Sequence, residues 1–286
     1  ILIQGGCQPF KKDAKHMSIT MRFDWLRILA LSLLCMSTTG VQAQAPVQSA
    51  SSQLPEDYPE KILFVGNSFT YYNDGLHMHY GNLLRAANLY EEGRNELRMM
   101  TYSGSGLWEH AAALGSAVTN DRWDAVVMHD YSNGPLTQWQ RFVASSDKLG
   151  EIARGQGARP LLLMTWAYAD QPEMTIQLAK AYTRRGKELA ATVIPVGLAF
   201  AAASKNLAVN LYSPDLLRFE GGEPVYERIV KHPSMAGTYL AACTVFATLT
   251  GLNPEGLIYT GGLDPEVARA LQRVAYTTVQ TYQRNP

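Results

Sequence analysis

The stretch "KILFVGNSFTYYND", from Lys61 to Asp74, decides the fold. Residues 61–66 form a short apolar run, which indicates a strand that is buried on both faces. A polar Gly-Asn-Ser turn follows, and residues 75–89 then have the apolar spacing of a helix. A strand that leads through a turn into a helix is typical of a parallel sheet. Ser68, in the turn, is interpreted as a nucleophile, a phosphate ligand or a helix cap.

The same alternation of strand and helix continues along the chain. It predicts one α/β domain with a three-layer α/β/α fold around a central five-stranded, mainly parallel sheet. Ligand sites in such folds lie outside the carboxyl ends of the strands. The predicted strands are 61–66, 97–102, 124–129, 160–165 and 192–196, and the predicted helices are about 75–89, 107–118, 136–154, 172–190, 234–250 and 265–283.

Composition narrows the class of protein. The chain has 286 residues, 47% of them hydrophobic, and a formal net charge of +0. This length supports one sizeable core, and the balanced charge gives no electrostatic reason to expect a nucleic-acid partner. His77 and His79 would point to nearly opposite faces of a helix, and Cys243 lies in an apolar run without a second cysteine nearby. No metal or cofactor is therefore expected.

The first part of the chain has the layout of an export signal. Residues 1–43 are interpreted as mistranslated upstream residues followed by a signal peptide, with Met17 and Met21 as the candidate starts. Arg22 and Arg27 precede a short apolar run, and small residues at 41–43 resemble a cleavage site. The alternative is a buried N-terminal helix. The signal layout predicts a bacterial protein exported to the periplasm or beyond, without stable membrane insertion after cleavage.

Residues 44–60 are rich in Ser, Gln, Ala and Pro, which predicts a disordered leader after cleavage. The folded domain is then expected to span residues 61–286.

Polar residues follow each predicted strand. The sheet rule brings these segments to one edge, together with a histidine that precedes a helix. The set contains a serine, glycine amides, an asparagine and a histidine, which are the parts of serine acyl transfer. The segments are Gly66–Ser68, Ser103–Gly106, His129–Gly134, Thr165–Asp170 and the "KHPSMAG" run around His232.

Four of these segments resemble blocks of the SGNH (GDSL-type) hydrolases: "FVGNSFT", "YSGSG", "WDAVVMHDYSN" and "HPSMAGTYLAA". The resemblance covers most of the chain from Lys61 to Gly251 and implies a flavodoxin-like fold. It implies Ser68 as the nucleophile and His232 as the base.

The resemblance also implies an oxyanion hole. Its donors would be the amide of Ser68, the amide of Gly104, with Gly106 as the fallback, and the side chain of Asn133. Some relatives with a GNSFT-type first block instead carry an amide side chain at the place of His129.

The orienting acid departs from the family pattern. The family has an aspartate three residues before the histidine, where this chain has Ile229. An insertion after Asp215 would leave Asp215 as the acid in space, and this is the first choice. The alternatives are Glu227 and a backbone carbonyl.

The sequence therefore predicts an exported serine esterase that forms an acyl-enzyme on Ser68. The expected substrate is a small-molecule or glycan ester, from which acyl groups such as acetyl are removed. His129, Trp166 and Tyr168 are the candidate substrate-binding residues, and residues 216–231 are expected to form a flap near His232. The alternative is a catalytically impaired glycan-binding module on the same fold.

Overall fold

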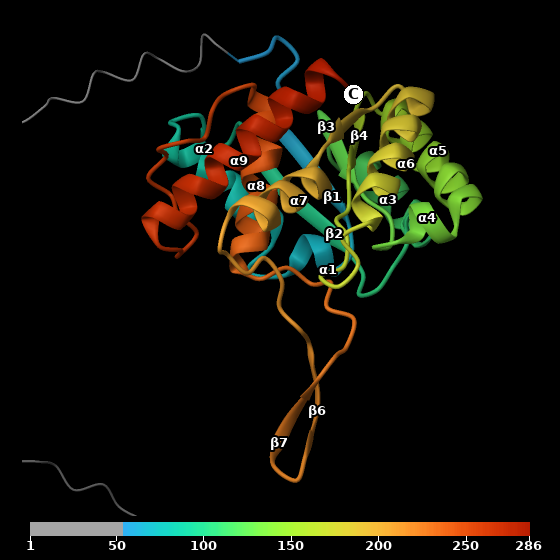
Figure 1. Ribbon diagram of the computed structural model, residues 1–286. Helices are drawn as coiled ribbons and strands as arrows, with labels where there is room; N and C mark the ends of the chain where they lie inside the picture. Colours follow the sequence, from blue (N-terminus) through green and yellow to red (C-terminus); the bar gives the residue numbers. More distant parts are fainter. Residues whose placement is uncertain (1–53) are drawn as a thin grey trace, which may run out of the picture. The chain divides into compact units, whose positions relative to one another are not determined.

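A computed structural model describes residues 54–286, so the predicted signal peptide and residues 44–53 of the predicted leader lie outside the described residues. The central sheet has five parallel strands in the order β2-β1-β3-β4-β5 (Figure 1). The predicted α/β/α fold with a five-stranded sheet is confirmed. The strands are β1 (Lys61–Gly66), β2 (Glu96–Thr101), β3 (Ala125–Met128), β4 (Arg159–Leu163) and β5 (Thr192–Ile194).

Helices connect the strands, and the six predicted helices are present with ends shifted by a few residues. The one-turn helix after β1 and the alanine-rich helix after β5 were not predicted, because neither a single turn nor an Ala-rich segment gives a clear apolar period. The predicted helices 107–118 and 136–154 are each divided into a single turn and a longer helix. The helices are α1 (Ser68–Tyr71), α2 (Leu76–Ala86), η2 (Leu107–Glu109), α3 (Ala111–Asn120), α4 (Gly134–Thr137), α5 (Trp139–Gly155), α6 (Met174–Leu189), α7 (Val196–Asn206), α8 (Met235–Thr250) and α9 (Pro265–Arg284).

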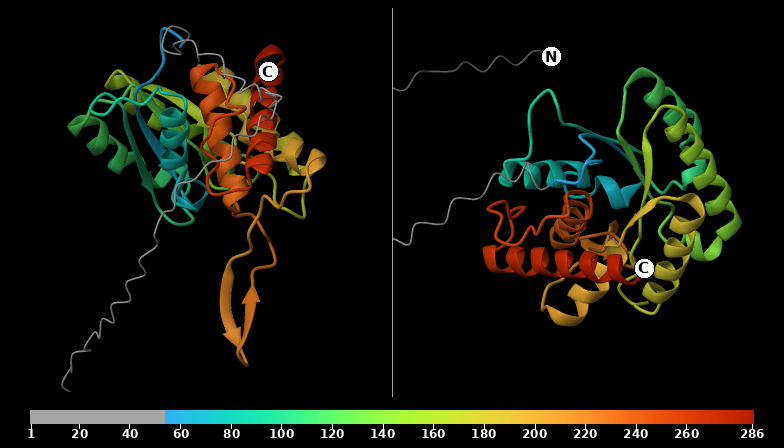
Figure 2. Two further views of the ribbon diagram at one scale, coloured as in Figure 1. Left: turned by 90° about the vertical axis from the view of Figure 1, so that its left-hand side faces the viewer. Right: turned by 90° about the horizontal axis from the view of Figure 1, so that it is seen from above.

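Helices cover both faces of the sheet (Figure 2). Alternate residues of β1, β3, β4 and β5 enter two separate cores, one on each face. Ile62 and Phe64 of β1 pack with α2, α7, α8 and α9, whereas Leu63 and Val65 pack with α3, α5 and α6. Successive side chains of a strand point to opposite faces, so burial on both faces requires the continuous apolar runs seen in the sequence.

The residues just before β1 contact the domain. Tyr58 packs against the core that contains α2, and its Oη lies 3.5 Å from Tyr80 Oη. The backbone N–H groups of Glu60 and Lys61 donate to Asp124 Oδ2 at 2.9 Å each. The described end of the predicted leader, residues 54–60, is therefore part of the folded surface.

Helix α8 is apolar on all sides and is almost entirely buried, with Cys243 inside the core. The other cysteines of the chain lie outside the described residues. Within residues 54–286, no helix has both the length and the apolar character needed to cross a membrane.

A β-hairpin of β6 (Leu216–Glu220) and β7 (Glu223–Tyr226) projects from the end of the domain where α1 lies (Figure 1). Every residue of β6 is exposed, and Phe219 keeps 64% of its surface accessible. The predicted flap is thus a hairpin whose strands extend away from the sheet. Only its base lies near His232, because Asp215 and Glu227 flank it.

Candidate active site

The turn after β1 places Ser68 at the carboxyl edge of the sheet. Asn67 caps α1, since its Oδ1 accepts the Phe69 N–H at 3.1 Å. Its Nδ2 donates to the carbonyls of Ser105 at 2.8 Å and Asp130 at 3.3 Å. This buried amide joins the segments that follow β1, β2 and β3, and so holds Ser68 in a defined position.

His232 contacts Ser68 from a segment that lies far downstream in the sequence. Its Nε2 lies 2.8 Å from Ser68 Oγ, although the residues are 164 positions apart. The backbone around the histidine is fixed on both sides. Ser213 N–H donates to the His232 carbonyl at 2.9 Å, and Asn73 Nδ2 donates to the Pro233 carbonyl at 2.9 Å.

Two carboxylates face the other ring nitrogen of His232. Asp215 Oδ2 lies 2.6 Å from Nδ1, and Glu227 Oε1 lies 3.7 Å from it. Neither contact is aligned as a hydrogen bond, and within residues 54–286 Nδ1 has no aligned acceptor. Catalytic hydrogen bonds of substrate-free enzymes are often poorly aligned and tighten on binding. The insertion predicted after Asp215 is the β6–β7 hairpin, whose base is closed by the Glu227 N–H bond to the Asp215 carbonyl at 2.9 Å.

Tyr72, which lies at the end of the short helix that begins at Ser68, holds the carboxylate of Asp215. Its Oη donates to Asp215 Oδ1 at 2.9 Å, and its ring stacks on the His232 ring with centroids 4.3 Å apart. Burial, followed by the bond to Asp215, raises the pKa of Tyr72, so the hydroxyl remains a donor.

Burial lowers the pKa of His232, and the nearby carboxylates of Asp215 and Glu227 oppose that shift only in part. The imidazole is therefore neutral at neutral pH. A neutral Nε2 beside the Ser68 hydroxyl can accept its proton.

The cavity in front of Ser68 has a volume of about 230 Å³. Tyr71 and Tyr72 line it, and Gly104 lies at its edge. The backbone N–H groups of Ser68 and Gly104 make no backbone hydrogen bond to any described residue. By contrast, the Gly106 N–H donates to Glu109 Oε2 at 2.9 Å and is already used.

Four of the predicted site residues do not line this cavity: Asn133, His129, Trp166 and Tyr168. Asn133 precedes α4 without a side-chain capping hydrogen bond. His129 lies beneath β1: its Nδ1 donates to the Asp130 carbonyl at 2.9 Å, and its Nε2 therefore accepts from Thr70 Oγ1 at 2.7 Å. Burial lowers the pKa of His129 to about 4. Both ring nitrogens are engaged, so His129 supports the backbone and does not contact a ligand.

Trp166 was expected to contact substrate, but only 1% of its surface is accessible. Its ring stacks between Phe69 and Phe200, with centroids 4.1 and 4.3 Å apart. Its indole N–H donates to the Lys231 carbonyl at 2.9 Å, which places the backbone beside His232. The stack fills the space behind Ser68. Tyr168 does not line the cavity itself but contacts Ser132, which does.

Sequence reasoning gave no role to Ser132 and Lys231, although both line the cavity. Lys231 Nζ lies 3.4 Å from Glu227 Oε2. Only their positions in the sequence could have indicated a place in the site, because Ser132 follows β3 and Lys231 directly precedes His232.

Asp215, Glu227 and His232 also have the donor atoms of a small metal site, with one ligand atom from each within 4.8 Å of the others. These donor atoms surround the same Nδ1 that an orienting acid would contact.

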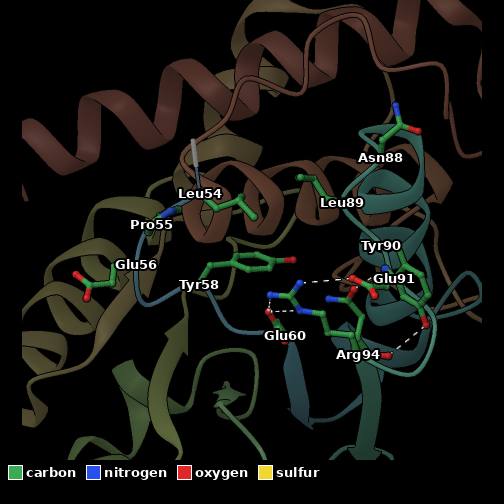
Figure 3. A pocket seen from close by; sticks show the side chains of 11 residues that line it. Leu54, Pro55, Glu56, Tyr58, Glu60, Asn88, Leu89, Tyr90, Glu91 and Arg94 are labelled. Atoms are coloured by element: carbon green, nitrogen blue, oxygen red, sulfur yellow. Dashed lines mark hydrogen bonds and ion pairs between the residues drawn. The ribbon is translucent and has the colours of Figure 1, made fainter. Parts of the chain in front are cut away.

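A second cavity of about 310 Å³ lies at the amino ends of β1 and β2, at the opposite end of the strands from Ser68 (Figure 3). Glu60 and Glu91 both contact Arg94 there.

Comparison with solved structures gives two informative matches. A candidate SGNH hydrolase from Slackia heliotrinireducens is 27% identical, with a TM-score of 0.53, over 66% of this chain and 98% of that one. The chain resembles the SGNH hydrolases. A DUF4886 family protein from Bacteroides uniformis shares the fold at 21% identity and a TM-score of 0.61, over 77% of this chain and 94% of that one. No protein-family model and no curated protein matches the chain.

Proposed function

We propose that this protein is a serine esterase that hydrolyses an acyl ester through an acyl-enzyme on Ser68. The observation that carries the proposal is the contact of Ser68 Oγ with His232 Nε2 at 2.8 Å, with Asp215 2.6 Å behind Nδ1. A nucleophile, a base and an orienting acid in this order form the triad arrangement. The resemblance to an SGNH hydrolase supports the same reaction class.

In the first half of the reaction, His232 Nε2 takes the proton of Ser68 as Oγ bonds to the ester carbonyl carbon. The free N–H groups of Ser68 and Gly104 stabilise the oxyanion. His232 then gives the proton to the leaving alcohol oxygen as the ester C–O bond breaks. In the second half, His232 takes a proton from water as the water oxygen attacks the acyl carbon. His232 then returns that proton to Ser68 Oγ as the bond between Oγ and the acyl carbon breaks, which releases the carboxylic acid.

The substrate proposed is an ester with a short acyl group, such as an O-acetylated glycan. The cavity has a volume of about 230 Å³, and Phe69, which lines it, stacks on the buried Trp166 ring. Both features favour a short acyl group. Tyr71 and Tyr72 at the cavity wall present aromatic surface to the rest of the substrate. A glycan substrate agrees with the export that the N-terminal signal layout predicts.

The test is Ser68→Ala, assayed with p-nitrophenyl acetate. We expect hydrolysis to fall to background while the thermal unfolding midpoint stays unchanged, because Ser68 contributes one hydroxyl to the fold. The matched control is Ser204→Ala, at an exposed serine on α7, which should hydrolyse like the wild type. Hydrolysis retained by Ser68→Ala would exclude Ser68 as the nucleophile.

A fluorophosphonate probe separates this proposal from a glycan-binding module on the same fold. An activated serine reacts with the probe, and labelling should disappear in Ser68→Ala. A wild-type protein that binds glycan but stays unlabelled would support the binding module instead.

A further inference from the structure

The cavity contains a hydroxyl group that the proposed mechanism does not use. Ser132 lines the cavity from the segment after β3, and only 3% of its surface is accessible. Its Oγ lies 2.9 Å from Tyr168 Oη, and its carbonyl accepts from Thr165 Oγ1 at 3.0 Å. Two residues after β4 thus hold both the side chain and the backbone of Ser132 in place.

The Ser132–Tyr168 pair has a preferred proton direction. Ser132 Oγ is the one hydrogen-bond partner of Tyr168 Oη among residues 54–286. Ser132 lines the cavity and Tyr168 does not, so a bound ester offers an acceptor to a Ser132 proton, whereas a Tyr168 proton has only Ser132 Oγ. When the cavity is occupied, donation from Tyr168 to Ser132 Oγ is therefore the direction that leaves both protons bonded. Burial, which raises the pKa of Tyr168, keeps its proton bound. The proton of Ser132 is then free to point into the cavity.

Three hydrogen-bond donors from three neighbouring strand ends meet at this cavity. Ser68 follows β1, Gly104 follows β2 and Ser132 follows β3, and all three line the space in front of Ser68 Oγ. We propose that the Ser132 hydroxyl is a third oxyanion donor, with its proton directed by Tyr168. The inference rests on the proposed esterase function.

The other side chains considered for this role do not line the cavity. Asn133 precedes α4 without a side-chain capping hydrogen bond, and both ring nitrogens of His129 are bonded within the domain. Ser132 is thus the residue with a side-chain donor, in the segment after β3, that lines the cavity in front of Ser68.

The experiment measures kcat/KM for p-nitrophenyl acetate, and inhibition by methylboronic acid, whose Ser68 adduct carries a tetrahedral negative charge. Ser132→Ala should lower kcat/KM by about 10²–10³-fold, the usual loss for one oxyanion donor. It should weaken boronate inhibition in parallel. Tyr168→Phe should give a smaller loss in both, and Ser132→Thr, which keeps a hydroxyl, should recover most of the activity. Ser204→Ala, at the exposed serine on α7, is the control and should leave both values unchanged.

The inference is overturned if Ser132→Ala folds and keeps kcat/KM within about threefold of the wild type, far from the expected loss. If Ser132→Ala fails to fold, Tyr168→Phe decides: unchanged kcat/KM and boronate inhibition contradict the proposal. Ser68→Ala in the same assays distinguishes failure of the proposed esterase mechanism from failure of the proposed third oxyanion donor. If it stays active the esterase mechanism itself fails, whereas an inactive Ser68→Ala beside an active Ser132→Ala rejects only the third donor.

Discussion

At the scale of single residues, the two carboxylates near His232 differ in what they can do. Asp215 lies 2.6 Å from Nδ1 and is held by Tyr72, whereas Glu227 lies 3.7 Å away and pairs with Lys231. Only Asp215 is close enough to orient the imidazole. Glu227 adds negative charge near the ring without a direct bond to it.

This difference predicts unequal losses on neutralisation. Asp215→Asn should lower kcat on the order of 10⁴-fold, as when a triad loses its orienting acid. Glu227→Gln should lower it by less than about tenfold, because it changes only a nearby charge. Steady-state kinetics with p-nitrophenyl acetate measure both. A larger loss for Glu227→Gln would show that Glu227 is the acid.

The pH profile follows from the charge of His232. The base must be neutral, and burial lowers its pKa below the ordinary value of 6.5. Activity should therefore rise with pH through a midpoint below 6.5. Asp215 raises the pKa of His232, so its removal in Asp215→Asn should move the midpoint of the residual activity to still lower pH. The profile of kcat/KM between about pH 4 and 9 reports this midpoint, and a midpoint above 6.5, or an upward shift in the variant, would contradict the assignment.

At the scale of elements, the β6–β7 hairpin separates the acid from the base in the chain without separating them in space. Leu216 pairs with Tyr226, and the Glu227 N–H bonds to the Asp215 carbonyl. The base of the hairpin thus maintains the contact between Asp215 and His232. The strands beyond it face solvent on both sides.

Shortening the hairpin should therefore spare the chemistry. Replacing residues 217–225 by two glycines leaves Leu216 and Tyr226 joined by a two-residue turn, which suits an antiparallel pair. We expect kcat/KM for p-nitrophenyl acetate within about threefold of the wild type and an unchanged unfolding midpoint, because exposed residues away from the core contribute little stability. The full-length protein carrying Asp215→Asn is the comparison for a lost acid. A shortened protein that is equally inactive would show that the strands themselves hold Asp215.

At the scale of the whole molecule, the parallel sheet could be predicted because its strands are buried on both faces and appear as apolar runs. The edge that carries the site followed from the rule that ligands bind outside the carboxyl ends of parallel strands. The expected roles of Ser68 and His232 followed from the resemblance of their segments to the SGNH hydrolases. Asp215 could only be ranked, because the hairpin removes it from its usual spacing before His232.

The details of the cavity could not be predicted, because they depend on side-chain direction after a strand ends. Trp166 turns into the core, and His129 turns beneath β1. Ser132 lines the cavity, whereas Asn133, which was expected there, does not. In the segment after a strand, neighbouring residues can lie on different sides of the chain, as Ser132 and Asn133 do. The alternation that predicts side-chain direction holds only within the strand itself.

The hairpin also offers a place where the chain could be cleaved into two fragments that remain associated. Its tip, Gly221-Gly222, is an exposed turn with positive φ at both residues. A cut there leaves Ser68 and Asp215 on one fragment and His232 on the other. The Tyr212–Pro233 bridge and the packing of α8 would still join the fragments. With a protease site inserted at the tip, the nicked protein should stay active and lose activity when the fragments are separated in denaturant. Mixing the fragments on refolding should restore hydrolysis, so that catalysis itself reports reassembly.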